Sequence, residues 1–153
     1  MSSRRGELRI AALEAPHVAA AQALLAGERP AELLDRALAG TRECVALPAT
    51  RGDGLLGVVV HGDVAGTRST AAVLWLAVAG DARREGTGRA LLDAAIARLR
   101  DRGATLVVAE VAADDRHAAI LALLAAAGFD REGVVPDFYR DGVALTLWTR
   151  RLA

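Results

Sequence analysis

The spacing of apolar residues in the first 40 positions predicts one short strand and two helices. Residues 7–13 alternate between polar and apolar side chains, which is typical of a short strand. Two stretches rich in alanine and leucine follow, at 15–27 and 30–40, and each predicts a helix. Each stretch ends in a glycine, Gly27 or Gly40, and the second begins with a proline. Proline at the first position and glycine after the last turn are common helix ends.

The middle of the chain changes to a pattern that is typical of strands. The apolar runs at 43–50 and 55–66 flank the turn sequence RGDG, so they predict a hairpin. Residues 70–80, with the sequence TAAVLWLAVAG, are almost continuously apolar. This composition is expected of a strand that is buried on both faces.

Helical spacing returns in the stretch RREGTGRALLDAAIARLRDRG at 83–103. Two glycines open it, and a stripe of apolar residues then predicts a helix that ends at Gly103. The stripe consists of residues 91, 92, 95, 96 and 99. A buried strand at 104–112 and a helix at 116–128, which ends at Gly128, are expected next. Two strands within 131–152 complete the chain, and the loop between them contains Pro136 and Asp141-Gly142.

These elements follow the order β-α-α-β-β-β-α-β-α-β-β, without repeats or a linker. The economical interpretation is one α/β (α+β) domain that spans residues 1–153. Within it, segment 70–112 is a strand-helix-strand unit. We expect its two strands to be parallel, with a right-handed crossover.

Composition narrows the functional classes. The 153 residues include 19 basic and 19 acidic side chains, so the net charge is zero and the basic excess of a nucleic-acid surface is absent. Every basic residue is arginine, which excludes a Walker A lysine and is typical of a GC-rich, bacterial genome. No apolar run spans a membrane, and Cys44, the only cysteine, is expected to be a small buried residue. We therefore expect a cytoplasmic protein without a metal site.

The glycines that open segment 83–103 point to anion binding. A helix N-terminus carries unpaired N–H groups and the positive end of the helix dipole, and glycine lets a phosphate approach them closely. Gly86 and Gly88 therefore fit a phosphate or pyrophosphate; the alternative is a tight turn with solvated arginines. Two nucleotide loops are excluded, because Arg89 follows the glycine where a Walker A loop has lysine and Leu91 replaces the third glycine of a dinucleotide fingerprint.

The run LAVAGDARREGTGRALL resembles the acyl-CoA-binding motif of the GNAT N-acetyltransferase superfamily, in which Arg/Gln-x-x-Gly-x-Gly/Ala opens a helix after a central strand. Arg83, Gly86 and Gly88 fill the fixed positions of this motif. The preceding Leu-x-Val, the element order, the chain length and the sequence AAAGF at 125–129 agree with the family. The resemblance implies a mixed central sheet of about six to seven strands with a splayed parallel pair, flanked by about four helices.

The resemblance also implies acetyl-CoA as co-substrate. Backbone groups of Leu76, Ala77 and Val78 would bind the pantetheine arm, and an N–H near Val78 would stabilise the oxyanion formed from the thioester carbonyl. The loop that would hold the pyrophosphate consists of Arg83, Arg84, Glu85, Gly86, Thr87, Gly88 and Arg89. The asparagine that the family has near the start of the next helix corresponds to His117 when counted back from Gly-Phe, and lies nearer Asp115 when counted forward from the strand.

In this family an amine attacks the acetyl thioester directly, so the amine must lose a proton and the departing thiolate must gain one. The tyrosine that often supplies the second proton is replaced by Leu124. Tyr139, the only tyrosine, is our candidate acid, from the loop between the last two strands; the alternative is a packing role. Glu110 interrupts an apolar strand beside the expected wedge and is our candidate base; the alternative is a pair with an arginine.

The sequence says least about the acceptor. Aromatic residues make up 3% of the chain, so a stacking pocket for a large planar acceptor would have to recruit Trp75, Phe138 or Tyr139, and we favour a small-molecule primary amine. Trp75 and Trp148 are most simply expected in the core. Glu28, Glu32 and Asp35 would attract a cationic amine, or would simply form a solvated helix face. The alternatives are a peptide or protein N-terminal acetyltransferase and a non-catalytic acyl-CoA-binding module. Neither nucleic acid nor a membrane is an expected partner, and a homodimer is left open.

Overall fold

Seven strands and four α-helices make up the part of the chain that the computed structural model describes, residues 6–25, 31–82 and 85–153. The strands are β1 (Arg9–Ile10), β2 (Val45–Arg51), β3 (Gly54–Asp63), β4 (Thr70–Val78), β5 (Leu106–Ala112), β6 (Asp130–Arg140) and β7 (Val143–Arg151). The α-helices are α1 (Ala15–Leu25), α2 (Ala31–Leu38), α3 (Thr87–Asp101) and α4 (Ala118–Ala126). Short 3₁₀ turns at Gly80–Ala82 and Asp115–His117 precede α3 and α4.

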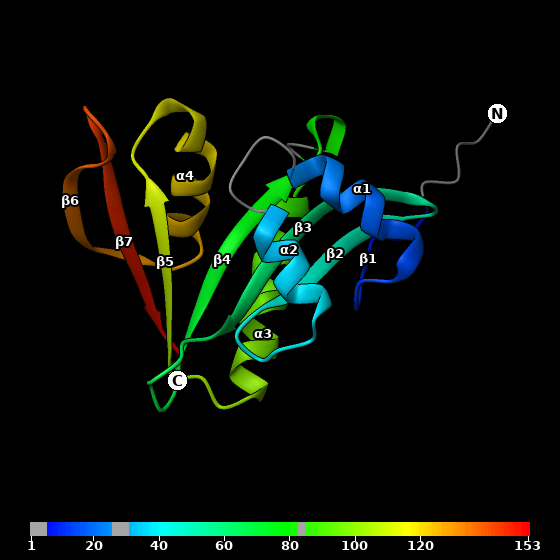
Figure 1. Ribbon diagram of the computed structural model, residues 1–153, viewed down its shortest axis with the longest axis horizontal. Coiled ribbons are helices and arrows are strands. Elements are labelled where there is room, and N and C mark those ends of the chain that lie inside the picture. Colours follow the sequence, from blue (N-terminus) through cyan, green and yellow to red (C-terminus); the bar gives the residue numbers. More distant parts are fainter. Residues whose placement is uncertain (1–5, 26–30, 83–84) are drawn as a thin grey trace.

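All seven strands belong to one sheet with the order β1-β2-β3-β4-β5-β7-β6 (Figure 1). Every neighbouring pair is antiparallel except β4 and β5, which are parallel. Helices α1 and α2 lie over one face of β2, β3 and β4, and α3 lies over the opposite face (Figure 1). The expected mixed sheet with one parallel pair and four helices is therefore confirmed.

Apolar clusters cover both faces of the sheet. In β3, Val59 belongs to the cluster beneath α3, whereas its neighbours Val58 and Val60 belong to the cluster beneath α1 and α2. Because both faces are covered, successive residues are all buried and the strand is continuously apolar. The stripe predicted for α3 is confirmed, since its five members are buried: Leu91, Leu92, Ala95, Ile96 and Leu99.

A β-bulge interrupts β4 at Leu74. Val60 of β3 pairs with Trp75 and His61 pairs with Val73, so Leu74 is an extra residue in β4. As a result, the adjacent residues Leu74 and Trp75 both pack on the side of α1 and α2. A bulge of this kind bends a strand and increases its twist.

The bulge follows the point at which β4 and β5 separate. Their parallel ladder has three pairs, Thr70–Leu106, Ala71–Val107 and Ala72–Val108. Beyond these pairs β4 continues to Val78 and β5 to Ala112, and the two strands diverge toward their carboxyl ends (Figure 1). The splayed parallel pair expected from the resemblance is therefore present.

Two element boundaries near the chain ends differ from the sequence prediction. The strand expected at 7–13 is limited to Arg9–Ile10. The loop expected around Pro136 is instead part of β6, whose ladder with β7 is interrupted between Val135 and Arg140. Proline has no N–H to donate, so it is tolerated where a ladder is broken.

The helix expected at 116–128 also begins differently. The Asp114 carboxylate accepts a hydrogen bond from the backbone N–H of His117, and this cap holds the residues between them in a 3₁₀ turn. Gly27 and Pro30, the expected end of α1 and start of α2, lie outside the described residues. No helix within the described ranges has the length and apolar character needed to cross a membrane.

His61 is a buried titratable residue of the core. It is 1% exposed, and neither ring nitrogen has a hydrogen-bond partner among the described residues. Burial and the positive charges of Arg102 and Arg98 lower the pKa of His61 to about 4. The negative charge of Asp63 raises this pKa and so offsets part of the effect. The folded protein therefore keeps this imidazole neutral at pH values where the unfolded chain binds a proton.

This difference predicts acid destabilisation. Stability should fall as the pH decreases from about 6.5 to about 4, because only the unfolded state takes up a proton at this residue there. His61→Gln removes that proton uptake. Between about pH 7.5 and about pH 5, urea titrations should show the wild type losing roughly 2 kcal/mol more unfolding free energy than the variant. Equal losses in the two proteins would contradict a neutral, buried His61.

Candidate active site

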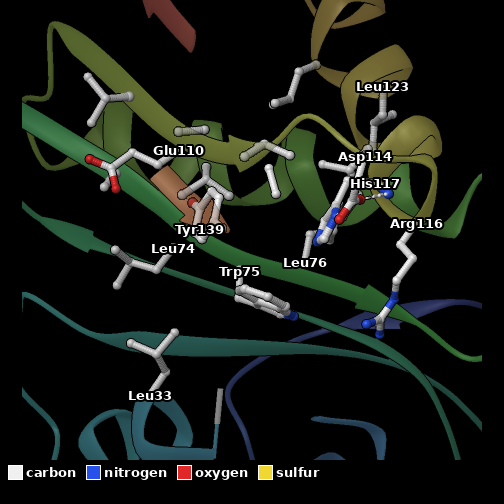
Figure 2. A pocket seen from close by; sticks show the side chains of 18 of the residues that line it. Leu33, Leu74, Trp75, Leu76, Glu110, Asp114, Arg116, His117, Leu123 and Tyr139 are labelled. Atoms are coloured by element: carbon white, nitrogen blue, oxygen red, sulfur yellow. Dashed lines mark hydrogen bonds and ion pairs between the residues drawn. The ribbon is translucent and has the colours of Figure 1, made fainter. Parts of the chain in front are cut away.

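A pocket of about 820 Å³ occupies the space between the separated strands. Residues 72–76 of β4 and 108–112 of β5 form two of its walls, and α2, α4 and the β6–β7 hairpin contribute the others (Figure 2). The outer edges of β4 and β5 are paired with β3 and β7. Their inner edges, beyond the pair Ala72–Val108, present backbone N–H and C=O groups that no strand pairs. Such groups are satisfied by a ligand, by water or by other groups of the protein.

Helix α3 begins next to this gap with an N-terminus that has no side-chain cap. Gly86 is the N-cap residue, with a φ of 80°, a left-handed conformation that glycine adopts without strain. The hydroxyl group of Thr87 is buried and has no hydrogen-bond partner in the described part of the chain. The first turn of α3 thus offers polar groups that suit an anion.

Gly88 faces side chains of both β4 and α4. A Cβ atom at this position would lie 3.4 Å from Cδ2 of Leu123 and 3.6 Å from Cγ2 of Val78. These are ordinary contact distances, so a methyl group fits, whereas a larger side chain would displace Leu123 or Val78. Gly88 is therefore needed for space rather than for its backbone conformation.

The side chains of the predicted pyrophosphate loop are engaged elsewhere. Glu85 forms an ion pair with Arg51 of β2 at 3.1 Å. Arg89 bonds to Asp93 at 3.0 Å and to the carbonyl oxygen of Ala126 at 3.3 Å, so its guanidinium group links α3 to α4. Glu85 and Arg89 therefore make contacts within the protein, and the backbone N–H groups of the turn suit an anion. Arg83 and Arg84 lie outside the described residues.

The residues present fit the coenzyme A that the sequence resemblance implies. Leu76, Ala77 and Val78 end β4 beyond its last pair with β5, where amide groups of a ligand can complete the strand edge. The uncapped turn Gly86–Thr87–Gly88 follows, where a pyrophosphate suits the helix dipole. The two features lie in the order along the chain that the family motif requires.

A carboxylate–imidazole pair precedes α4 in the wall of the pocket (Figure 2). Asp114 Oδ1 accepts a hydrogen bond from His117 N at 3.1 Å and is 2.5 Å from the ring nitrogen Nδ1. Arg140 of β6 lies 3.7 Å from the second oxygen of Asp114. The side-chain hydrogen bond with His117 lowers the pKa of Asp114, and the charge of Arg140 lowers it further. Burial raises this pKa, but by less. The His117 ring lies edge-on to Trp75, with ring centroids 6.5 Å apart.

The two candidate catalytic residues both line the pocket (Figure 2). Glu110 is exposed and lies in β5, opposite Leu147 of β7. Tyr139 lies in β6 rather than in the expected loop, is 39% exposed, and has its ring edge-on to Phe138 at 5.0 Å. The structure therefore brings a carboxylate and a phenol from distant parts of the sequence into one pocket.

The sequence prediction missed several pocket residues. Trp75, expected in the core, is half-buried and lines the pocket, because the bulge at Leu74 changes the face on which it packs. The spacing Asp114-x-x-His117 is a helix-capping pattern that could have identified the carboxylate. Arg140 carries no such signal, because only the pairing of β6 with β7, which in turn pairs with β5, brings it to Asp114.

Two further sequence expectations concern an acid and a nucleophile. Leu124, which replaces the family's tyrosine, lines the pocket and is 3% exposed, so the usual phenol position is an apolar wall. Cys44 is fully buried, and its Sγ donates a hydrogen bond to the carbonyl oxygen of Leu33 at 3.1 Å. Burial raises the pKa of this thiol, which therefore behaves as the small core residue that was expected.

Comparison with known proteins agrees with this geometry. Residues 14–129 match the family described as the acetyltransferase (GNAT) family. No curated protein matches the chain at a significant level. Among solved structures, a protein from Desulfovibrio desulfuricans assigned to the GNAT family of acetyltransferases is 26% identical, with 96% of this chain and 99% of that chain covered and a TM-score of 0.81.

Two more distant structures share the fold. The ribosomal-protein-S18-alanine N-acetyltransferase of Escherichia coli is 22% identical, with 96% and 95% of the two chains covered and a TM-score of 0.80. A chain of the NatC complex bound to Gag peptide and CoA is 17% identical, with 96% and 99% covered and a TM-score of 0.81.

The space around Gly88 predicts a graded effect of substitution on coenzyme A binding. Gly88→Val should weaken the affinity for coenzyme A at least about tenfold, since its branched side chain would displace Val78 or Leu123. Gly88→Ala is the matched control and should bind more tightly than the valine variant, because its methyl group makes only ordinary contacts. Calorimetric titration measures both affinities, and melting temperatures confirm folding. Wild-type affinity in a folded Gly88→Val variant would contradict this role.

Proposed function

The chain belongs to the acetyltransferase (GNAT) family and is therefore an acyltransferase, and on this premise we propose that it moves the acetyl group of acetyl-CoA to a primary amine of a small molecule. Enzymes of this family use acetyl-CoA, and CoA is bound in one structure that shares this fold. The finer proposal, a small-molecule acceptor, rests on the part of the pocket that lies beyond the expected thioester.

The walls of the pocket support a compact acceptor. Residues of α2, β5, β6 and β7 reach it from different sides, including Leu33, Glu110, Tyr139 and Val143. Trp75 adds an aromatic surface next to them. A site enclosed by apolar and aromatic groups, with a few polar groups among them, is typical of small-molecule binding. This enclosure is the observation that carries the proposal.

Glu110 supplies the chemistry that an amine acceptor requires. An alkyl amine with a pKa near about 10 arrives as an ammonium ion at neutral pH and must lose a proton before it attacks. The Glu110 carboxylate, on the strand that borders the thioester gap, attracts the ammonium ion and accepts this proton, directly or through water. The neutral amine is then held against the thioester, and positioning supplies most of the remaining rate enhancement.

A peptide acceptor is the second candidate, favoured by one feature of β6. The apolar residues Val134, Val135, Phe138 and Tyr139 are exposed along this edge strand, next to the mouth of the pocket. A peptide could pack against them while its N-terminal amine reaches Glu110. Two structures with this fold are named for an alanine acetyltransferase acting on a ribosomal protein and for a complex bound to a peptide.

Thiol release from acetyl-CoA tests these proposals. We expect turnover with some members of a panel of small primary amines, including amino acids, polyamines and amino sugars, and weaker turnover with N-terminal peptides. Turnover with peptides alone would replace the small-molecule proposal with the peptide one. Tight acetyl-CoA binding without turnover across both panels would leave a non-catalytic binding module.

The role of Glu110 predicts a selective kinetic defect. Glu110→Gln should lower kcat/KM for the amine at least about tenfold, because the variant neither attracts the ammonium ion nor accepts its proton. The KM for acetyl-CoA should stay within about twofold of wild type, since the carboxylate serves the acceptor. Glu14→Gln, at an exposed carboxylate outside the pocket, is the matched control. An unchanged kcat/KM in Glu110→Gln would remove Glu110 from the reaction.

A further inference from the structure

The proposed reaction leaves one proton transfer without a group in the usual place. When the amine attacks, its nitrogen carries a surplus proton, and the sulfur that leaves needs one. The family's tyrosine position is Leu124, which has no proton to give. The inference below rests on the proposed acetyl transfer and concerns the group that carries this proton.

His117 lies on the same side of the helical segment as the missing tyrosine. It precedes Leu124 by seven positions, close to two helical turns, and both residues line the pocket. The His117 ring is placed between Asp114 and β4 in Figure 2, on the side of the pocket where Leu76 and Trp75 lie. This is the strand that would hold the acetyl-bearing arm.

We propose that His117, oriented by Asp114, is the catalytic group that carries the proton from the attacking amine to the departing thiolate. The pair would therefore take over in this chain the role of the absent tyrosine. Asp114 is a positioning residue, because it acts through the imidazole ring.

The hydrogen bond to Asp114 decides which ring nitrogen is available. An ionised carboxylate only accepts hydrogen bonds, so the short contact with Nδ1 requires a proton on Nδ1. In the neutral ring, Nε2 then has a free lone pair. No described residue hydrogen-bonds Nε2, so it can accept a proton within the pocket.

The proton balance closes without another reagent. The amine lone pair forms the new N–C bond while the carbonyl π electrons move to oxygen. Nε2 takes one proton from the resulting nitrogen cation and becomes an imidazolium. As the carbonyl re-forms and the C–S bond breaks, the imidazolium returns that proton to sulfur. The products are an amide and a free thiol, and His117 is neutral again.

Asp114 is suited to stabilise the transient imidazolium. Its side chain is 12% exposed, so its charge is little screened by water. The hydrogen bond with His117 and the nearby charge of Arg140 lower its pKa, which keeps the carboxylate ionised at neutral pH. The other charged or titratable groups that line the pocket are Arg116 beside the pair, Glu110 of β5, Tyr139 and Arg140 of the β6 end, and Glu32 and Arg36 of α2.

Tyr139, the acid expected from sequence, is less suited to this transfer. It is 39% exposed and comes from β6 rather than from the helix that borders the thioester gap. We therefore give Tyr139 a role in contacting the acceptor and His117 the proton transfer. Tyr139→Phe should then change KM for the amine more than kcat.

Substitution by asparagine separates proton transfer from cofactor binding. Counted back from Gly-Phe, the family's asparagine falls at His117, which makes this residue a candidate contact to coenzyme A. His117→Asn would then retain that contact while the proton carrier is lost. We expect kcat to fall about 100-fold or more, with a change of less than about threefold in acetyl-CoA affinity. His17→Asn, in α1 and outside the pocket, is the matched control and should keep wild-type kcat.

Two further measurements test the pair as a unit. Asp114→Asn should lower kcat about tenfold and change acetyl-CoA affinity less than about threefold, because the His117 ring loses the carboxylate that orients it. The double variant should be no slower than His117→Asn alone, since Asp114 acts through His117.

The outcomes also separate this inference from the proposed function. If wild-type protein transfers acetyl groups and folded His117→Asn keeps at least half of wild-type kcat, the proton role is wrong and the proposed function stands. If His117→Asn weakens acetyl-CoA binding but keeps kcat at saturation, His117 is a cofactor contact only. If the wild type releases no thiol with any amine or peptide, the proposed function itself fails. An additive loss in the double variant would contradict the coupling.

Discussion

The site depends on one constraint: β4 and β5 pair for three residues and then must separate. The two strands share a sheet at their amino ends, and the bulge at Leu74 turns β4 away directly afterwards. The separation is sustained because β3 and β7 hold the outer edges of the two strands. Backbone groups on the inner edges are left for a ligand, so the same geometry that interrupts the sheet creates the binding surface.

The helices on either side extend this arrangement in different ways. Helix α3 follows β4 in the chain, and its glycine-rich first turn presents backbone groups that suit an anion. Helix α4 starts where β5 ends, and its first turn adds side-chain chemistry through Asp114 and His117. One wall of the gap thus presents backbone groups, and the other presents a carboxylate and an imidazole.

Local sequence patterns predicted one part of this site, whereas features that depend on strand pairing were not predicted. The glycine turn and the α3 stripe are local patterns with a fixed spacing, so both were predicted correctly. The bulge at Leu74 could not be predicted, because it becomes visible only through the register with β3. The position of Trp75 in the pocket follows from that bulge and was therefore missed.

The hairpin at the end of the chain illustrates the same limit. Tyr139 was singled out because it is the only tyrosine, and the pocket includes it, but it lies in a strand rather than a loop. Asp137 has a φ of 54°, and its carboxylate accepts a hydrogen bond from Gly142 N at 2.8 Å. Such contacts fix where Tyr139 and Arg140 lie, and they join residues whose pairing no periodic pattern indicates.

The absence of lysine acquires a physical meaning at this site. When an enzyme binds an acetyl thioester, a neutral lysine side chain within reach could attack the thioester and become acetylated. The basic residues that line this pocket, Arg36, Arg116 and Arg140, are guanidinium groups that stay protonated at physiological pH and have no free lone pair to attack with. They can orient carboxylates, as Arg140 does beside Asp114, without competing for the acetyl group. At these three positions the pocket therefore carries positive charge without a nucleophilic lone pair.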